Sequence, residues 1–357
     1  MRSIAFALLV SACGLFPDLG GLSSSDAGEN PDVKNDALVL PTDGGSDVVT
    51  APDADPDAMV TYARTITIKN NASQSLPKGY TIGVAFSESA LQAAITAGKM
   101  RSDMNDLRVR GTSGQRDRLV DAPPLSRVVW FSLASPISAN ATDTTYEITY
   151  GVPNAASPPS DGSNVFDFYD DFSGTTIDSQ WMTQGTANVG SGVLTLPHGG
   201  LGALTTVSQA PTSTAEWRAQ ITDPTSNPDP NTGFYYWFGF QHTGDFDADQ
   251  PWIIWIARAA SSVGAEDAAD GCTSVCGNTP LSQSNQFRYY AIERQPTQTI
   301  FSIDLAPSYT TAATNDQAQS LMIRSYLQTS DLVVDWFRSR VRIYPEPTVT
   351  LGPEQQQ

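Results

Sequence analysis

From Tyr62 to Tyr344 the sequence is a succession of short segments in which apolar and polar residues alternate. A period of two places successive side chains on opposite faces of a β-strand, one face toward a core and one toward solvent. The clearest helical spacing is in SESALQAAITAGKM, where Leu91, Ala94 and Ile95 share one face. Many short strands with almost no helix are typical of sheets packed face to face. The pattern therefore predicts an all-β chain.

A segment rich in Pro, Ser and Gly, GVPNAASPPSDGSN, interrupts this pattern after residue 150. With 357 residues the chain exceeds the size of a single core, so two domains are expected. The shorter strands before the interruption predict a small β-sandwich over 61–152, and the interruption itself predicts a hinge at 153–165. The bulkier strands that follow predict a jelly roll over 166–346. The closing PEPTVTLGPEQQQ predicts a disordered tail at 347–357.

The first residues, MRSIAFALLVSACG, have the composition of an export signal. The apolar run Ile4–Val10 is too short to span a bilayer. The four residues VSAC that end at Cys13 resemble a bacterial lipobox, which implies a signal peptide over 1–12 and lipidation of Cys13. Because Gly14 rather than Asp follows, the resemblance also implies an outer-membrane, surface-exposed protein held by its lipid alone. The alternatives are an ordinary signal peptide, or a misassigned start with Cys13 as a buried cysteine.

Residues 13–60 are acidic and without periodicity, with ten Asp or Glu residues against Lys34 alone. Such a composition cannot bury enough apolar surface to offset chain entropy, so this segment is expected to be a disordered tether. The whole chain has a formal net charge of −18, which argues against nucleic acid as a partner because phosphates would be repelled. Glycans, cations and other proteins remain possible partners.

Two cysteines, Cys272 and Cys276, lie close together in DGCTSVCGN. In an exported protein this spacing favours a local disulfide. The closed loop is so small that the entropic stabilisation would be only about 2 kcal/mol. A zinc site is the alternative, but His198 and His242 are the only histidines of the chain that could complete it.

Four stretches, taken in order, resemble a known family: ITAGKMRSDMNDLRVR, ITYGVPNAAS, FDFYDDFSGTTIDSQW and VVDWFRSRVRIYPEPTVTLG. They are similar to the domain of unknown function 2341 (DUF2341) of bacterial and archaeal surface proteins, which a concanavalin A-like (laminin G-like) sandwich usually follows. The resemblance extends over roughly residues 62–352. It implies a secreted or anchored surface protein with a lectin-like second domain, and it brings no established reaction.

Sandwiches of this kind also occur in glycoside hydrolases, which need two carboxylates flanking the scissile bond. The laminarinase-like branch supplies them from one strand as Glu-x-Asp-x-x-Glu, and that pattern does not occur in this sequence. Glu216 and Glu293 each stand alone in their strands, and His198 and His242 lie in turn-like segments without a nucleophile elbow. We therefore expect a protein that is not an enzyme, with glycoside hydrolysis as a less favoured alternative.

Three carboxylates form a candidate calcium site. Asp170 and Asp171 open the second domain, and the alternation of its last strand places Asp335 on the same face as core residues. A buried carboxylate must be paired or bind a cation. Lectin-like sandwiches commonly place the first and last strands side by side, so the three side chains could hold calcium. The alternative is that Asp335 pairs with an arginine or with amides at a strand end.

Aromatic residues form the candidate ligand site. In GFYYWFGFQ one face reads as core, and the opposite face carries Tyr235, Trp237 and Gln241. Aromatic rings pack against the apolar side of a pyranose, and an amide can bind its hydroxyls. Trp255 and Tyr290, in neighbouring strands, could extend this platform. The alternative is that these rings are buried in the core.

The last strand carries Arg338, Arg340 and Arg342 at alternate positions, and we predict that these outward-facing arginines pair with acids across the sheet.

Together these features predict a non-catalytic, lipid-anchored surface protein that binds extracellular or cell-wall carbohydrate. The alternative is a structural or protein-binding component of the cell envelope.

Overall fold

The computed structural model describes residues 61–357 apart from 122–126, 198–200, 222–233, 242–251, 259–261, 268–271, 281–285, 313–316 and 326–330. The predicted signal peptide (1–12), the tether (13–60) and the lipidated Cys13 lie outside the described residues and stay predictions. None of the described helices is both long enough and apolar enough to cross a membrane.

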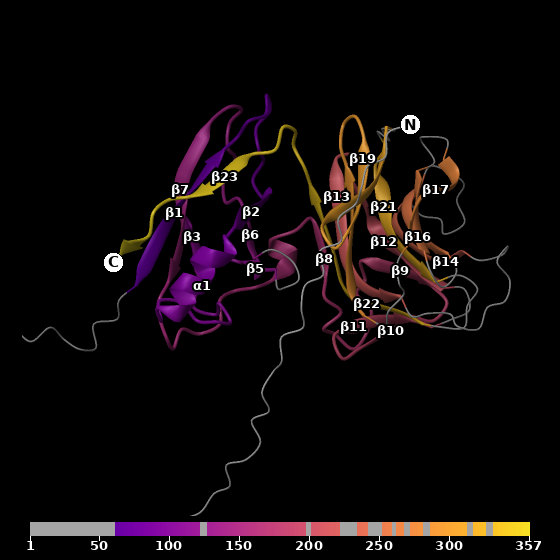
Figure 1. Ribbon diagram of the computed structural model, residues 1–357, viewed down its shortest axis with the longest axis horizontal. Helices are drawn as coiled ribbons and strands as arrows, with labels where there is room; N and C mark the ends of the chain where they lie inside the picture. The colour runs from indigo at the N-terminus through magenta and orange to yellow at the C-terminus, as the bar shows by residue number, and fades with distance from the viewer. Residues whose placement is uncertain are drawn as a thin grey trace, which may run out of the picture. The chain divides into compact units, whose positions relative to one another are not determined.

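Residues 62–150 and the C-terminal strands form the small sandwich (Figure 1). Alternation builds it as predicted: in β1 the side chains of Ile66 and Ile68 are buried, and those of Thr65, Thr67 and Lys69 are more exposed. Its first sheet has the order β23-β1-β7-β3-β4, with β24 also on β1, and its second sheet has the order β2-β6-β5. The elements are β1 (Tyr62–Lys69), β2 (Thr81–Ala85), α1 (Glu88–Thr96), β3 (Arg108–Gly111), β4 (Gly114–Arg116), β5 (Leu119–Val120), β6 (Val128–Ser132) and β7 (Thr142–Tyr150).

The helix α1 lies where SESALQAAITAGKM predicted it. The Ser87 side chain caps its start by accepting a hydrogen bond from the Ala90 amide at 3.3 Å. Leu91 is the buried residue of the helix. Gly98 follows the end of the helix with φ +68°, a conformation that favours glycine.

The C-terminal segment differs from the prediction of a disordered tail at 347–357. β23 (Thr348–Leu351) and β24 (Gln355–Gln356) both pair antiparallel with β1, with Ile66 opposite Leu351. Val349 and Leu351 are partly buried against the small-sandwich core. The short TVTL motif between prolines gave little indication of a strand in the sequence. It forms one because β1, far away in the sequence, pairs with it. The small sandwich is thus completed by both ends of the described chain.

Strands between residues 168 and 341 form the large sandwich, whose two sheets face each other across one core (Figure 1). The eight-stranded sheet has the order β10-β11-β22-β13-β18-β19-β20, with β8 on β22. Its strands are β8 (Phe168–Asp170), β10 (Asn188–Gly190), β11 (Val193–Leu196), β13 (Ser213–Ile221), β18 (Arg288–Arg294), β19 (Thr299–Ile303), β20 (Ala306–Thr311) and β22 (Leu332–Val341). The first and last strands of this sandwich lie side by side, as predicted, with Phe337 opposite Asp170.

The seven-stranded sheet has the order β17-β16-β15-β14-β21-β12-β9. Its strands are β9 (Trp181–Gln184), β12 (Leu201–Gln209), β14 (Phe234–Gln241), β15 (Ile253–Arg258), β16 (Ser262–Asp267), β17 (Cys272–Pro280) and β21 (Gln319–Ser325). The predicted all-β fold class, a small sandwich followed by a jelly-roll sandwich, is confirmed for the described chain.

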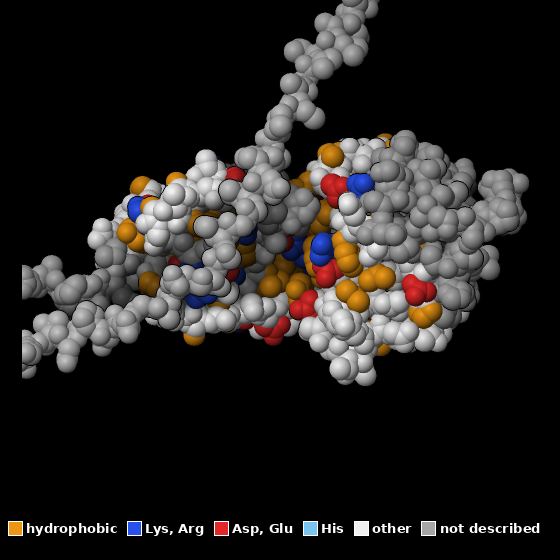
Figure 2. Space-filling view, turned by 60° about the horizontal axis from the view of Figure 1, so that its bottom comes forward, with side chains coloured by type: hydrophobic (Ala, Val, Ile, Leu, Met, Phe, Trp, Pro, Cys, Tyr) orange, Lys and Arg blue, Asp and Glu red, His pale blue; other side chains and the backbone are white. Residues whose placement is uncertain are grey.

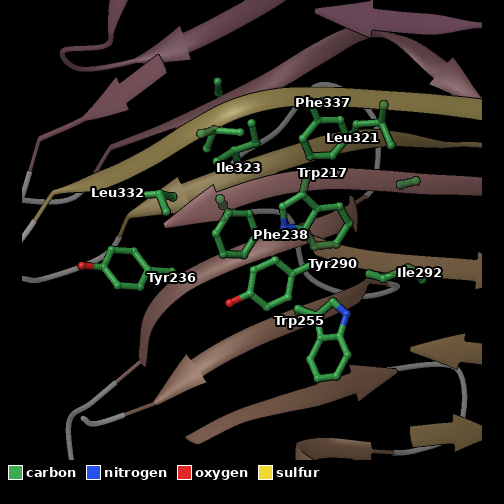
Figure 3. Close-up of a cluster of buried hydrophobic side chains, with 14 of the residues drawn as sticks. Trp217, Tyr236, Phe238, Trp255, Tyr290, Ile292, Leu321, Ile323, Leu332 and Phe337 are labelled. Atoms are coloured by element: carbon green, nitrogen blue, oxygen red, sulfur yellow. The ribbon is translucent and has the colours of Figure 1, made fainter. Parts of the chain in front are cut away.

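Stacked aromatic rings fill the centre of the large-sandwich core (Figure 3). The Trp217 ring lies between Phe238 and Phe337, with ring centroids at 5.4 and 5.3 Å. Tyr290 stacks on Trp217 at 6.0 Å. Rings from both sheets therefore interlock, and such contacts stabilise a core beyond the area that they bury.

The segment 151–165, predicted to contain a hinge at 153–165, lies along the small sandwich. The Arg118 amide donates to the Pro159 carbonyl at 3.0 Å, and the Ser132 hydroxyl donates to the Asn164 carbonyl at 2.7 Å. A short 3-10 helix, η1 (Gly162–Asn164), precedes β8. These contacts fix the backbone at several points, so the segment does not have the free backbone of a hinge.

Charged side chains of both signs lie among hydrophobic ones on the face drawn in Figure 2. On the large sandwich Arg218 pairs with Asp335, and Arg288 pairs with Asp304 at 2.7 Å. Exposed pairs of this kind contribute little to stability, on the order of 1 kcal/mol or less.

Candidate functional site

Two tryptophans lie side by side on the face of the seven-stranded sheet that points away from the core. The rings of Trp237, in β14, and Trp252, just before β15, stack with centroids 6.5 Å apart and 29° between their planes. Both side chains are only partly buried. They pack on four fully buried side chains, Leu204, Ile254, Ile256 and Met322. We call this the Trp237–Trp252 face.

Strand alternation explains why Trp237 lies there. In β14 the side chains of Tyr236, Phe238 and Phe240 belong to the core between the sheets. Trp237 therefore points to the opposite face, where it packs against a separate apolar cluster. Antiparallel pairing of β14 with β15 sets Trp237 opposite Ile256, whose side chain is part of that cluster. The tryptophan platform is thus a direct consequence of period two and of the register between two strands.

A cation completes the face. The Arg324 guanidinium, from β21, lies over the Trp237 ring with its central carbon 5.2 Å from the ring centroid. A guanidinium over an indole is attracted by the negative face of the ring. The face therefore combines ring surface, which can cover an apolar ligand surface, with a positive charge from an arginine that is itself 6% exposed.

The predicted ligand residues divide between this face and the core. Trp237 and Gln241 share the outward parity of β14, although the Gln241 side chain is buried. Tyr235 lies in β14, but its side chain lies outside what the structure describes. Trp255 and Tyr290 are wrong as ligand residues, because their side chains are 0% and 2% exposed within the core.

The register between strands explains these two errors. Trp255 lies opposite Phe238, a core residue, and donates its indole N–H to the Ala291 carbonyl at 3.2 Å. Tyr290 lies opposite Trp217 in the eight-stranded sheet. The sequence shows the alternation within each strand. It does not show which face of β15 lies on the same side of the sheet as Trp237, because that depends on the pairing of β14 with β15. For the same reason sequence reasoning missed Trp252, whose only signal was its shared parity with Ile254 and Ile256.

The structure does not group the three carboxylates proposed for calcium. Asp170 accepts hydrogen bonds from the Phe172 amide and the Trp181 indole N–H, both at 2.8 Å. Burial raises the pKa of Asp170. Asp171 accepts from the Ser173 amide at 3.1 Å. Each carboxylate therefore organises its own loop, and among the described residues no group of three His, Cys, Asp or Glu side chains is placed to hold a metal. Calcium binding stays a prediction.

The predicted orientation of Asp335 is wrong. The register between β13 and β22 shifts between Arg218 and Ala219, so that Trp336 and Val334 face consecutive residues of β13 and Asp335 is passed over. This irregularity changes the parity of the strand, and the core receives Val334 and Phe337 instead. Asp335 forms an ion pair with Arg218, which was the alternative to the calcium site.

The three arginines in and just after β22 pair with acids as predicted, but Arg340 pairs with Glu346 after the strand rather than across the sheet. Arg338 donates from Nε to Glu216 at 2.6 Å, and Arg342 forms an ion pair with Glu293. Burial tends to raise the pKa of Glu216, but Arg338 and Arg340 outweigh it and hold the pKa below its usual value. The two glutamates that stood alone in the sequence are therefore ion-pair partners of arginines.

Cys272 and Cys276 lie in β17, opposite Asp267 and Ala265. Their side chains lie outside what the structure describes, as do His198 and His242, so the disulfide stays a prediction.

Residues 121–184 match a family model described as Domain of unknown function (DUF2341). The predicted resemblance to DUF2341 is confirmed. The DUF2341 match begins directly after β5 in the small sandwich and ends with β9 in the large one. A comparison with curated proteins finds no match.

Several solved structures resemble the chain distantly. A laminarinase from Rhodothermus marinus is 15% identical and has a TM-score of 0.39, with 50% of this chain and 98% of that chain covered. A β-1,3-1,4-glucanase (lichenase) derived from a mouse hindgut metagenome is 13% identical and has a TM-score of 0.37, with 49% of this chain and 98% of that chain covered. A structure from work on endo-acting O-glycanases of the human gut microbiota is 12% identical with a TM-score of 0.38, covering 50% and 100%.

Proposed function

We propose that this protein binds carbohydrate, without hydrolysing it, on the Trp237–Trp252 face. The observation that carries the proposal is the pair of partly buried indoles, stacked 6.5 Å apart on a floor of four buried apolar side chains. Rings held in this way lose little conformational freedom when a ligand covers them, so little of the binding free energy is lost to ordering the side chains.

The chemistry of the face suits a pyranose. The C–H side of a sugar ring is apolar and can lie on an indole, while its hydroxyls need hydrogen-bond partners around the rim. Arg324, over the Trp237 ring, adds a positive charge beside the rings. The proposal therefore rests on the two indole rings.

The proposal of binding without hydrolysis is supported by the positions of the isolated acids. A glycoside hydrolase places two carboxylates on either side of the scissile bond. Glu216 in β13 and Glu293 in β18 belong to the eight-stranded sheet, whereas the Trp237–Trp252 face belongs to the seven-stranded sheet. Glu216 is also held in an ion pair with Arg338 at 2.6 Å. Neither glutamate could act on a sugar bound to the tryptophans.

A glycan array probed with the full chain tests the proposal. Trp237→Ala and Trp252→Ala should each weaken binding of the recognised glycan by about 2 kcal/mol, roughly 30-fold in Kd. Trp336→Ala is the matched control, because Trp336 is a partly buried tryptophan of the other sheet. Unchanged binding in both variants would contradict the proposed site.

Two other outcomes would point elsewhere. If the wild-type chain binds no glycan and instead copurifies with envelope proteins, the structural or protein-binding alternative replaces carbohydrate binding. If it releases reducing ends from a β-glucan, the protein is an enzyme and the non-catalytic part of the proposal is wrong.

We further propose that the protein acts at the cell envelope, anchored through lipidated Cys13 in the outer membrane. The support is the VSACG sequence around Cys13. Cells fed labelled palmitate should label the wild-type protein and leave Cys13→Ser unlabelled. Equal labelling of both would contradict the anchor.

A further inference from the structure

The DUF2341 match covers parts of both sandwiches. Residues 121–184 include β6 and β7 of the small sandwich, the connecting segment, and β8 and β9 of the large sandwich. Contacts within the described chain join these parts into one compact unit that extends over 57–357. A segment that begins in one sandwich and ends in the other is poorly suited to fold alone. We therefore look for its structural role at the contact between the two sandwiches.

Arg338 is the centre of that meeting point. It lies in β22 of the large sandwich, and its side chain is only 4% exposed. Its Nη1 and Nη2 donate to the two carboxylate oxygens of Asp121, at 2.7 and 3.2 Å. Asp121 follows β5 in the small sandwich. A guanidinium held by both oxygens of a carboxylate is among the stronger and more directional side-chain contacts.

Aromatic rings from both sandwiches enclose the same guanidinium. Its central carbon lies 5.2 Å from the Trp130 centroid, 4.7 Å from Phe166 and 4.8 Å from Trp336. The Trp130 indole N–H donates to Asp121 at 2.7 Å, which orients the carboxylate toward Arg338. The rings exclude water, and exclusion of water strengthens the ion pairs that they surround.

A second acid shares the Arg338 guanidinium with Asp121. Arg338 also binds Glu216 of its own sandwich at 2.6 Å. If the small sandwich moved away, Arg338 would keep Glu216 but lose both hydrogen bonds to Asp121 and the rings of Trp130 and Phe166.

The connecting segment and the returning chain add further contacts at the same place. The Thr81 hydroxyl, from β2, donates to the Val165 carbonyl at 2.6 Å. After β22, the Tyr80 hydroxyl accepts from the Ile343 amide at 3.2 Å. Both crossings between the sandwiches are therefore tied to β2 and the residue before it.

We propose that the segment matching DUF2341 is a docking surface for a neighbouring sandwich, and that its partner is the arginine-bearing outer face of β22. Asp121, Trp130 and Phe166 are the recognising side chains, and Arg338 is the recognised one. Docking makes the two sandwiches one rigid unit and leaves the opposite sheet, with the Trp237–Trp252 face, outside the joint. The inference is independent of what that face binds.

The test measures the joint in the full chain. Spin labels carried by unnatural amino acids at exposed Lys78 and Leu305 report the distance between the sandwiches by double electron–electron resonance. The wild type should give one narrow distance distribution and one cooperative melting transition. Asp121→Ala should broaden the distribution at least twofold and separate the melting into two transitions.

Two further variants make the test decisive. Asp335→Ala is the matched control, since it removes a β22-region carboxylate whose partner Arg218 lies in the same sandwich, and it should leave the distribution narrow. Arg338→Met removes the contact from the other side, and combined with Asp121→Ala it should broaden the distribution no further. A broad wild-type distribution, or a narrow one in both Asp121→Ala and Arg338→Met, would overturn the proposal.

Discussion

Gly239 shows how closely β14 approaches both its neighbour β15 and the facing sheet of the large sandwich. It lies in β14 with φ +138°, and a Cβ at this position would be 2.4 Å from the Ile253 carbonyl oxygen and 2.6 Å from Ile292 Cδ1. The first of these neighbours is backbone and cannot move aside cheaply. Only glycine fits here, two residues beyond Trp237 on the strand that presents the candidate site.

We therefore expect Gly239→Ala to lower the free energy of unfolding by about 2–5 kcal/mol, because overpacking and a strained φ act together. Urea unfolding measures the loss. Gly190→Ala is the control, since a Cβ there meets nothing within 4 Å and φ is not in the positive range. Equal stability of the two variants would show that β14 can relax around the added carbon.

The alternation of residues within each strand could be predicted from the sequence, whereas the pairing of each strand with its neighbours could not. The alternation in β1 and β14 identified correctly which side chains each strand buries. The position of Trp255 required the register between β14 and β15, which is set by pairing over the whole hairpin. Individual strands carry their own period, and pairing between strands decides which faces join.

The register shift in β22 and the pairing of β23 could not be predicted from the sequence either. The register shift at Asp335 reverses the parity of β22, and nothing in VVDWFRSR marks it. The strand β23 was missed because its partner β1 lies almost the whole described chain away. In contrast, the arginine row of β22 was predictable, since the strand keeps its alternation after the shift and unpaired charges are not buried.

At the scale of the whole molecule, one guanidinium connects three structural parts. Arg338 joins its own strand to Glu216 in β13 and to Asp121 in the small sandwich. The sequence indicated two sandwiches and a separating segment, and it predicted a hinge because Pro, Ser and Gly are common there. Hydrogen bonds to the small sandwich and the Arg338 contacts turn that segment into part of a joint.

Acidification should weaken this joint through Glu216. The arginines hold the folded-state pKa of Glu216 below its usual value, although burial opposes them. A carboxyl with a lowered folded pKa contributes stability that is fully present above its unfolded pKa, near 4.3, and is lost as the pH falls through the lower folded pKa. Glu216→Gln should therefore lose about 3 kcal/mol of unfolding free energy at pH 7, and the gap to the wild type should narrow at pH 3.

Urea unfolding of both chains at the two pH values measures this narrowing. The control is Glu88→Gln, which removes an exposed carboxylate at the start of α1 and should change stability little at either pH. A gap between wild type and Glu216→Gln that stays constant from pH 7 to pH 3 would mean that Glu216 supports the joint by shape and hydrogen bonding rather than by charge. In that case Asp121 alone would have to supply the charge that holds Arg338 between the sandwiches.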